Sequence, residues 1–294
     1  MSTQVPRLFA GLVDDAAVFP PGSASLPDAL AAHRRHRDSW YADLVGPLLL
    51  PATRLAELAA LLDADERIAV GVIGDGPLDR LAEARAHADP RIEIRQVEAA
   101  VARRGEDPLP GLATLVDQAR DAARPAAGSP AAGPDWYAEI PLTFGLTAAL
   151  DALAAARADG VPIAAKFRTG GLAAELFPTP VELAAVIGAC RDRDLPFKLT
   201  AGLHHATRHL DPETGFTHHG FGNVLAATLA ATGGAETDRV AGLLAALDPL
   251  PLVEPVRARR DDERPLWIGF GSCSILEPLT DLIRLGLVNG GFDG

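Results

Sequence analysis

Short β-like runs alternate with Ala/Leu-rich segments of helical period along almost the whole chain. The predicted strands are Leu12 to Phe19, Ala42 to Leu50, Ile68 to Ile73, Ile92 to Val97, Trp136 to Pro141, Ile163 to Arg168, Phe197 to Ala201 and Leu266 to Phe270. The predicted helices include Ala52 to Leu62, Leu78 to Ala88, Leu112 to Ala123, Leu146 to Ala158, Val181 to Arg191 and Val224 to Leu247.

This order predicts a (β/α)₈ TIM barrel, an α/β fold, formed by residues 1–294 as a single domain. Parallel strands need crossover connections, and a closed ring of strands leaves no unpaired edge. An open doubly wound sheet is the alternative. The first strand region, GLVDDAAVFPPG, lacks the glycine fingerprint that such a dinucleotide-binding sheet carries there.

Two stretches interrupt the alternation. Residues 124–135 are rich in Pro, Gly and Ala and are predicted to form a surface loop. Residues 202–223 follow the seventh strand and hold five of the eight histidines of the chain. Because the loops after barrel strands lie on the catalytic face, this second stretch is predicted to be an active-site flap.

Composition narrows the classes of partner. The chain has 294 residues, of which 48% are hydrophobic and 22% charged, and a net charge of −12. That charge disfavours nucleic acids and anionic membrane surfaces. No apolar run is long enough to span a membrane, and the first residues lack the features of a secretory signal, so we expect a cytoplasmic protein. Two cysteines are too few for a disulfide framework.

Lysine is rare, which makes its positions informative. Of the 27 basic Lys and Arg residues only Lys166 and Lys198 are lysines. Arginine replaces lysine as a surface charge, but it does not lose its proton in proteins, whereas a lysine can be tuned to act as a base or nucleophile. The two positions therefore point to chemistry, although chance retention is the simpler alternative.

The alternation of side chains along a strand predicts which residues point into the barrel. The apolar residues of IAAKFR, PFKLTAG and WYAEIP should face the helices. The opposite faces then carry Lys166, Arg168, Lys198, Thr200, Gly202, Tyr137 and Glu139. Glu139 should neighbour Lys166, and both lysines should converge from adjacent strands. The alternative is a structural layer of ion pairs, but buried charges cost several kcal/mol each to desolvate.

Two glycine-rich turns could bind an anion. After the eighth strand, WIGFGSCSILEPL places small residues directly before a helix, where free N–H groups favour a phosphate or carboxylate. The candidate residues there are Gly269, Gly271, Ser272 and Ser274. A second turn, after the sixth strand, offers Thr169, Gly170 and Gly171. Helix capping by Ser272 or Ser274 is an equal alternative.

Three segments, AAKFRTGG, PFKLTAGL and IGFGSCSI, resemble in order and strand position the motifs of deoxyribose-phosphate aldolase and related class I aldolases. The resemblance implies Lys166 as the Schiff-base nucleophile, Lys198 as the cation that lowers its pKa, and Gly271 with Ser272 at a phosphate. It covers about a tenth of the chain. Arg168 stands where that family usually has a small hydroxyl residue, and the histidine flap has no counterpart in it.

The chemistry of an amine nucleophile can be stated without the resemblance. A lysine with the ordinary pKa of about 10.4 is almost wholly protonated at pH 7 and does not attack a carbonyl. A neighbouring cation and burial lower that pKa. The iminium that forms withdraws electrons from the adjacent carbon and permits C–C cleavage, condensation or dehydration, with Glu139 or Tyr137 as candidates for proton transfer. The first hypothesis is thus a lyase acting on a small anionic carbonyl compound, without a cofactor.

The flap supports a second hypothesis, a metal-dependent barrel enzyme with Lys166 as acid or base. Imidazole and carboxylate groups suit zinc, iron or manganese, and Glu139 and Asp14 are candidate oxygen ligands. The histidines are His204, His205, His209, His218 and His219, at spacings that fit no standard metal motif. His204 and His205 are alternatively hydrogen-bonding partners of the substrate. A third hypothesis is a non-catalytic barrel that binds a phosphorylated metabolite, and assembly into a homo-oligomer is left open.

Overall fold

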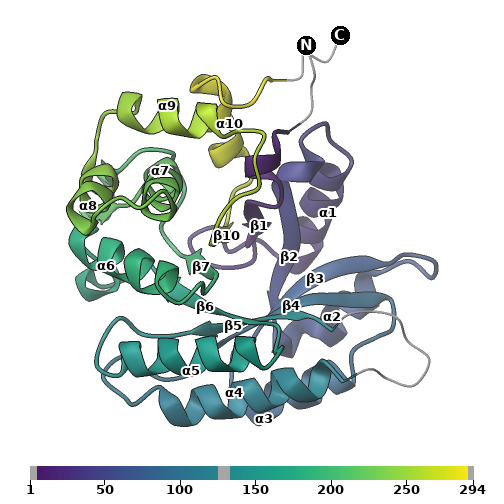
Figure 1. Ribbon diagram of the computed structural model, residues 1–294. Helices are drawn as coiled ribbons and strands as arrows, with labels where there is room; N and C mark the ends of the chain where they lie inside the picture. The colour runs from purple at the N-terminus through teal and green to yellow at the C-terminus, as the bar shows by residue number, and fades with distance from the viewer. Residues whose placement is uncertain (1–4, 125–132, 291–294) are drawn as a thin grey trace.

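Eight parallel strands close into a barrel in the computed structural model, which describes residues 5–124 and 133–290 (Figure 1). The strands pair around the ring in the order β1, β10, β7, β6, β5, β4, β3, β2 and back to β1. Their bounds are β1 Val13–Asp15, β2 Val45–Pro51, β3 Ile68–Ile73, β4 Ile92–Ala100, β5 Asp135–Glu139, β6 Ile163–Arg168, β7 Phe197–Thr200 and β10 Trp267–Ser272. The predicted (β/α)₈ fold is confirmed, and each of the eight predicted strands contains or overlaps one of these strands.

Helices follow every barrel strand and surround the ring. Their bounds are α1 Leu26–Arg37, α2 Leu55–Leu61, α3 Leu78–Ala86, α4 Leu109–Ala122, α5 Leu146–Ala158, α6 Pro180–Arg191, α7 Phe221–Thr232, α8 Thr237–Ala245, α9 Leu250–Ala258 and α10 Leu276–Arg284. The apolar faces of the strands meet these helices, as the alternation predicted: Ile163, Ala165 and Phe167 of β6 are fully buried.

The expected single helix from Val224 to Leu247 is wrong, because it is two helices, α7 and α8. Gly233 and Gly234 separate them, and Gly234 has a φ of +88°, which favours glycine. Almost every residue of α7 is buried, since α6, α8 and α9 pack around it (Figure 1). An all-round apolar helix is the expected result of being enclosed in this way.

The structure tests only one of the two predicted irregular stretches, 124–135 and 202–223, over most of its length. Most of the predicted surface loop at 124–135 lies outside the described residues. The histidine-rich flap follows β7 as predicted and contains a two-stranded hairpin, β8 His209–Leu210 with β9 Thr217–His218. Its histidines thus sit beside the carboxyl end of the barrel. No helix within the described residues is long and apolar enough to cross a membrane.

Candidate active site

An ion-pair chain of six charged side chains crosses the barrel interior. Its members, in order of contact, are Arg168, Glu139, Lys166, Glu98, Lys198 and Asp14. They come from β6, β5, β4, β7 and β1, and positive and negative groups alternate. We call this series the ion-pair chain.

The two lysines lie side by side with one carboxylate between them. Lys166 and Lys198 are register partners on the adjacent strands β6 and β7. Glu98 uses both of its oxygens: Oε2 lies 2.7 Å from the Lys166 Nζ, and Oε1 lies 2.5 Å from the Lys198 Nζ. Lys198 also donates to Asp14. The predicted convergence of the lysines is therefore confirmed, and Glu98 links them.

Glu139 likewise pairs with two cations, Lys166 and Arg168, at the outer end of the ion-pair chain. Its Oε2 lies 2.8 Å from the Lys166 Nζ, while its Oε1 accepts from the Arg168 guanidinium, with the Nε at 3.1 Å and the Nη2 at 3.0 Å. Glu139 and Lys166 are register partners on β5 and β6, as expected from the alternation. One carboxylate therefore joins a buried amine to an arginine at the surface.

The exposed fraction of the side chains falls steeply from Arg168 to Glu98 along the ion-pair chain. Arg168 is 43% exposed, Glu139 17%, Lys166 4% and Glu98 1%. The ion-pair chain thus begins at solvent and ends in the dry interior. Because an apolar layer usually fills a barrel at this depth, these buried charges carry a large desolvation cost that only their mutual contacts offset.

The pairing decides the charge state of both lysines. Burial alone lowers the pKa of the Lys166 ammonium, but Glu139 and Glu98 outweigh that effect and the pKa is raised. The pKa of Lys198 is likewise raised, because Asp14 and Glu98 outweigh its burial. The lowered Lys166 pKa that the aldolase resemblance implies is therefore not found: the pKa is raised, and Glu98 lies between the two cations.

The three carboxyl groups of the ion-pair chain differ in the direction in which the protein shifts their pKa values. Burial raises the pKa of Glu98, but Lys166 and Lys198 outweigh it and lower that pKa to about 2. Lys166 and Arg168 lower the pKa of Glu139 in spite of its burial. For Asp14 burial prevails over Lys198, and the pKa is raised. Asp14 is therefore the carboxyl group in the chain that takes up a proton most readily.

Two uncharged side chains complete the interior. Gln96 donates to the Asp14 Oδ2 at 2.7 Å, and the Lys198 Nζ lies 4.8 Å from the centre of the Tyr137 ring. Tyr137 points inward as predicted, but burial raises its pKa strongly. Its hydroxyl is therefore a poor proton donor compared with the neighbouring ammonium and carboxyl groups. Gly46 of β2 makes room for Asp14, since a Cβ there would overlap the carboxylate.

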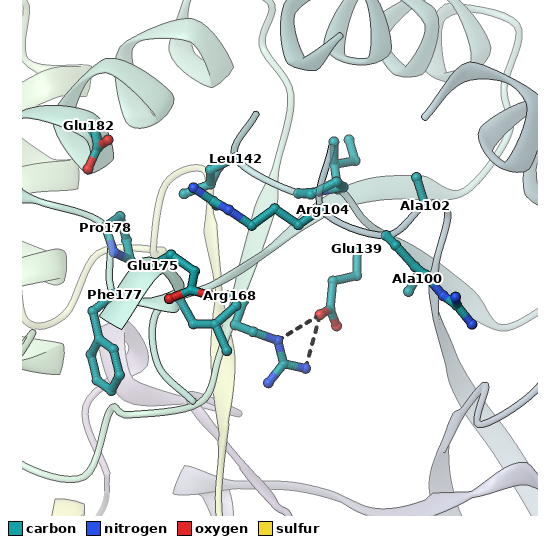
Figure 2. Close-up of a pocket in the computed structure, with 14 residues that line it drawn as sticks. Ala100, Ala102, Arg104, Glu139, Leu142, Arg168, Glu175, Phe177, Pro178 and Glu182 are labelled. Carbon is teal, nitrogen blue, oxygen red and sulfur yellow. Dashed lines mark hydrogen bonds and ion pairs between the residues drawn. The ribbon is translucent and has the colours of Figure 1, made fainter. Parts of the chain in front are cut away.

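A cavity opens above Glu139 at the carboxyl ends of β4, β5 and β6 (Figure 2). Its volume is about 360 Å³, within the range of small-molecule sites. Its lining includes Arg103, Arg104, Glu139, Arg168, Glu175 and Phe177. Neither lysine lines it, because Glu139 and Arg168 lie between the cavity and Lys166.

The glycine-rich turns have structural explanations for most of their residues. Thr169 is fully buried, and its hydroxyl donates to the backbone carbonyl of Ala201 at 2.7 Å. Gly170 packs closely on the backbone of Gly202. Ser274 accepts from the Glu277 N–H at the start of α10, and Ser272 accepts from the Ser274 N–H, each at 3.3 Å. The first contact favours the capping alternative for Ser274, whereas Ser272 binds an N–H that precedes α10.

The remaining candidates in these turns are Gly171, Thr200, Gly269 and Gly271. Gly171 lies against the Leu176 side chain, and Gly271 lies against Leu49. Thr200 pairs with Gly271 on β10 and is partly exposed. Phosphate binding at these residues stays a prediction.

We predict that Gly269→Ala destabilises the fold. A Cβ at this position would lie 2.5 Å from the Leu12 carbonyl oxygen, and φ is +153°. The expected loss is about 1–3 kcal/mol in the free energy of unfolding, measured by urea denaturation. Gly188→Ala in α6 is the control, because a Cβ there meets open space and should stabilise the helix by about 0.5–1 kcal/mol. Equal stability of both variants would contradict the packing explanation for Gly269.

The histidines do not form the metal site of the second hypothesis. Among the described residues no group of three or more His, Cys, Asp and Glu side chains is arranged to hold a metal ion. One ring nitrogen of each histidine has its own partner: His204 meets Glu277, His205 meets Asp281, His209 meets Thr207, His218 meets Gly202 and His219 meets Pro178. Glu139 and Asp14, the candidate oxygen ligands, belong to the ion-pair chain instead.

The same contacts locate the flap relative to the cavity. His218 has its ring 5.0 Å from that of Phe177, which lines the cavity, and His209 stacks on His218 at 5.4 Å. His204 and His205 face α10 through Glu277 and Asp281. They do not line the cavity, so a role for these two in substrate binding stays a prediction.

We predict that purified protein contains no stoichiometric zinc, iron or manganese. Within residues 5–124 and 133–290 no three His, Cys, Asp or Glu side chains are arranged to hold an ion, so a tightly bound metal lacks a set of ligands there. Elemental analysis before and after dialysis against EDTA measures this. About one tightly held metal ion per chain would contradict this arrangement of the flap.

Reasoning from the sequence missed several residues of the site. Glu98 fell just beyond the predicted fourth strand, which in fact runs on to Ala100. Extending the alternation in IEIRQVEAA would have placed Gln96 and Glu98 on one face. Arg103 and Arg104 lie in the loop after β4, and Glu175 lies in the short 3-10 helix Ala174–Leu176, where no periodicity signals a shared cavity.

Comparison with known proteins assigns neither a family nor a function to the chain. No family model, no curated protein and no solved structure matches the chain.

Proposed function

We propose that the protein is a class I aldolase-like lyase in which Lys166 forms a Schiff base with a small anionic carbonyl compound. The TIM-barrel fold is compatible with such an enzyme. The proposal rests on the ion-pair chain and on the resemblance of the three lysine- and glycine-containing segments to class I aldolases. The observation that carries it is the position of Lys166 between two carboxylates, Glu98 and Glu139.

A lysine held in this way can become a nucleophile only if its proton has an acceptor. Glu98 and Glu139 both lie within hydrogen-bond distance of the Lys166 Nζ, so either carboxylate can take that proton. The neutral amine then adds to the carbonyl carbon, and the carbinolamine loses water to give the iminium. A carboxyl group that gained the proton can return it to the departing hydroxyl.

Lys198 acts on Lys166 through Glu98. Its ammonium stabilises the Glu98 carboxylate and, once Lys166 is neutral or part of an iminium, keeps a positive charge within the barrel. Asp14, with its raised pKa, can hold a proton at the inner end of the chain. A purely structural layer of ion pairs would offer no reason for the lysines to survive in a chain that uses arginine at every other basic position.

Exchange of α-protons tests this proposal without knowledge of the natural substrate. An iminium on Lys166 acidifies the carbon next to the carbonyl, so the protein should catalyse deuterium exchange into the methyl group of pyruvate in D₂O. Proton NMR follows the loss of signal over time. Exchange at the rate of the buffer blank for a panel of aldehydes, ketones and keto acids would contradict the proposal.

A further inference from the structure

Three arginines line the cavity. Arg103 and Arg104 follow β4, and Arg168 ends β6, so three guanidinium groups from one loop and one strand end line one opening. In Figure 2 the Arg104 side chain extends across the opening in which Arg168 and Glu175 also lie. The protein as a whole has a charge of −12, whereas in this lining the three arginines balance three glutamates, Glu139, Glu175 and Glu182.

The lining also holds three acidic residues, and two of them have hydrogen-bond or ion-pair partners. The Glu182 carboxylate accepts from the Thr179 N–H at 2.7 Å and the Thr179 hydroxyl at 2.8 Å and so caps α6. Glu139 is held by Lys166 and Arg168. Glu175 is the other acidic residue in the lining. Arg103 and Arg104 are exposed at the opening, so their guanidinium groups can meet an incoming ligand.

Arg168 also closes the route to Lys166. Its guanidinium binds one oxygen of Glu139, and the other oxygen of Glu139 binds Lys166. Lys166 is only 4% exposed behind this pair. A carbonyl compound in the cavity reaches Lys166 only if Arg168 and Glu139 separate.

We infer that the cavity binds an oxyacid group of the substrate, a carboxylate or a phosphate, through Arg168 with Arg103 and Arg104, and that this binding detaches Arg168 from Glu139 and opens the route to Lys166. The inference rests on the proposed function for its second half. Guanidinium groups bind such anions by paired, charge-assisted hydrogen bonds, which makes Arg168 able to exchange the Glu139 carboxylate for the carboxylate or phosphate of a ligand.

The exchange has a chemical consequence. Once Arg168 binds the ligand, Glu139 keeps Lys166 as its partner and loses one of its two stabilising cations. The proton then passes from the Lys166 Nζ to the Glu139 carboxylate, which leaves a neutral amine facing the carbonyl carbon and a neutral carboxyl group beside it. Arrival of an acid-bearing substrate thus activates the nucleophile, while a neutral carbonyl compound does not trigger the step.

Calorimetric titration with unreactive anions tests the binding half. The probes are malonate and inorganic phosphate, added to wild type, Arg168→Gln, Arg104→Gln, Arg103→Gln and the control Arg95→Gln, whose side chain is exposed and pairs with Glu93 outside the cavity. We expect wild type to bind at least one probe, Arg168→Gln to weaken it about tenfold or more, and Arg95→Gln to leave it unchanged. Tighter binding of malonate would indicate a carboxylate as the group that the cavity binds, and tighter binding of phosphate would indicate a phosphate.

Two results would overturn the binding half. One is that neither anion binds to wild type at millimolar concentration. The other is that Arg168→Gln binds as tightly as wild type. Circular dichroism of each variant verifies that the fold is retained.

Borohydride trapping with two probes tests the gating half. In wild type, pyruvate should be trapped faster than propanal. In Arg168→Gln, trapping of pyruvate should fall, whereas trapping of propanal should rise because the barrier before Lys166 is weakened. If wild type traps both probes and the variant changes neither rate, the inference is wrong and the proposed function stands. If wild type traps neither probe, the Schiff-base function is contradicted, and the titration still decides the anion site.

Discussion

Replacement of Lys166 by arginine is expected to abolish Schiff-base chemistry while the barrel stays folded. Arginine keeps a positive charge between Glu98 and Glu139, but its guanidinium does not lose a proton and forms no iminium. We expect α-proton exchange into pyruvate to fall by at least about 10³-fold, in line with the removal of a nucleophile. NMR measures the exchange, and thermal unfolding measures the fold.

Lys198→Arg is the matched control for that experiment. It also replaces a buried lysine of the ion-pair chain by arginine, but Lys198 does not bond to the substrate in this account. We expect slower exchange that remains well above that of Lys166→Arg. Retention of wild-type exchange in Lys166→Arg would assign the nucleophile to another residue.

Loss of Glu98 is expected to be the most destabilising single change in the ion-pair chain. Glu98→Ala leaves Lys166 and Lys198 next to each other without the carboxylate that joins them. Removing one partner of a buried ion pair costs about 3–5 kcal/mol in the free energy of unfolding. Urea denaturation measures this loss. Glu93→Ala on the same strand is the control, because its 58% exposed ion pair with Arg95 should contribute less than about 1 kcal/mol.

The contribution of Glu98 to stability also has a defined dependence on pH. Its pKa is lowered in the folded protein from 4.5 to about 2 by Lys166 and Lys198, which outweigh its burial. A group with a lowered folded-state pKa stabilises the fold above its unfolded pKa and loses that effect as pH falls through the folded value. The stability difference between wild type and Glu98→Gln should therefore shrink between about pH 4.5 and pH 2. A difference that stays constant over that range, or a Glu98→Ala variant within 1 kcal/mol of wild type, would contradict this role.

The barrel could be predicted because its signals are local and repeated. Strand runs such as IAAKFR bury one apolar face against helices, so the alternation that places Phe167 outside also places Lys166 inside. The same logic placed Glu139 beside Lys166 before any contact was known. The boundary between α7 and α8 was missed, because the apolar pattern continues on both sides of Gly233 and Gly234.

The charge state of the site could not be predicted, because it depends on distances across the barrel. The sequence placed two lysines on neighbouring strands, and their proximity suggested mutual repulsion. The structure places Glu98, from the far strand β4, between them, and the sign of the effect on the Lys166 pKa reverses. The histidine flap shows the same limitation. Its five histidines lie close together in the sequence, but their ring nitrogens meet partners on α10, within residues 202–223 and just before α6.

The cavity could not be predicted from the sequence either, because its lining comes from separate segments. Arg103 and Arg104 read as ordinary charged residues in a loop, and only folding brings that loop above Glu139 and Arg168. Arg168 itself was noted as a departure from the aldolase pattern. Arg168 lines the cavity and pairs with Glu139, so in the proposed gating it is the group that an anionic substrate detaches.

Peptide mapping after borohydride reduction tests the central claim most directly. Protein incubated with pyruvate and reduced with borohydride is digested, and mass spectrometry locates the added mass. The account predicts a single modified lysine, Lys166, with Lys198 unmodified although it is chemically the same group on the adjacent strand. Modification of Lys198 alone would contradict the assignment of the nucleophile, and an absence of adducts across a panel of keto acids and aldehydes would contradict Schiff-base chemistry at this site.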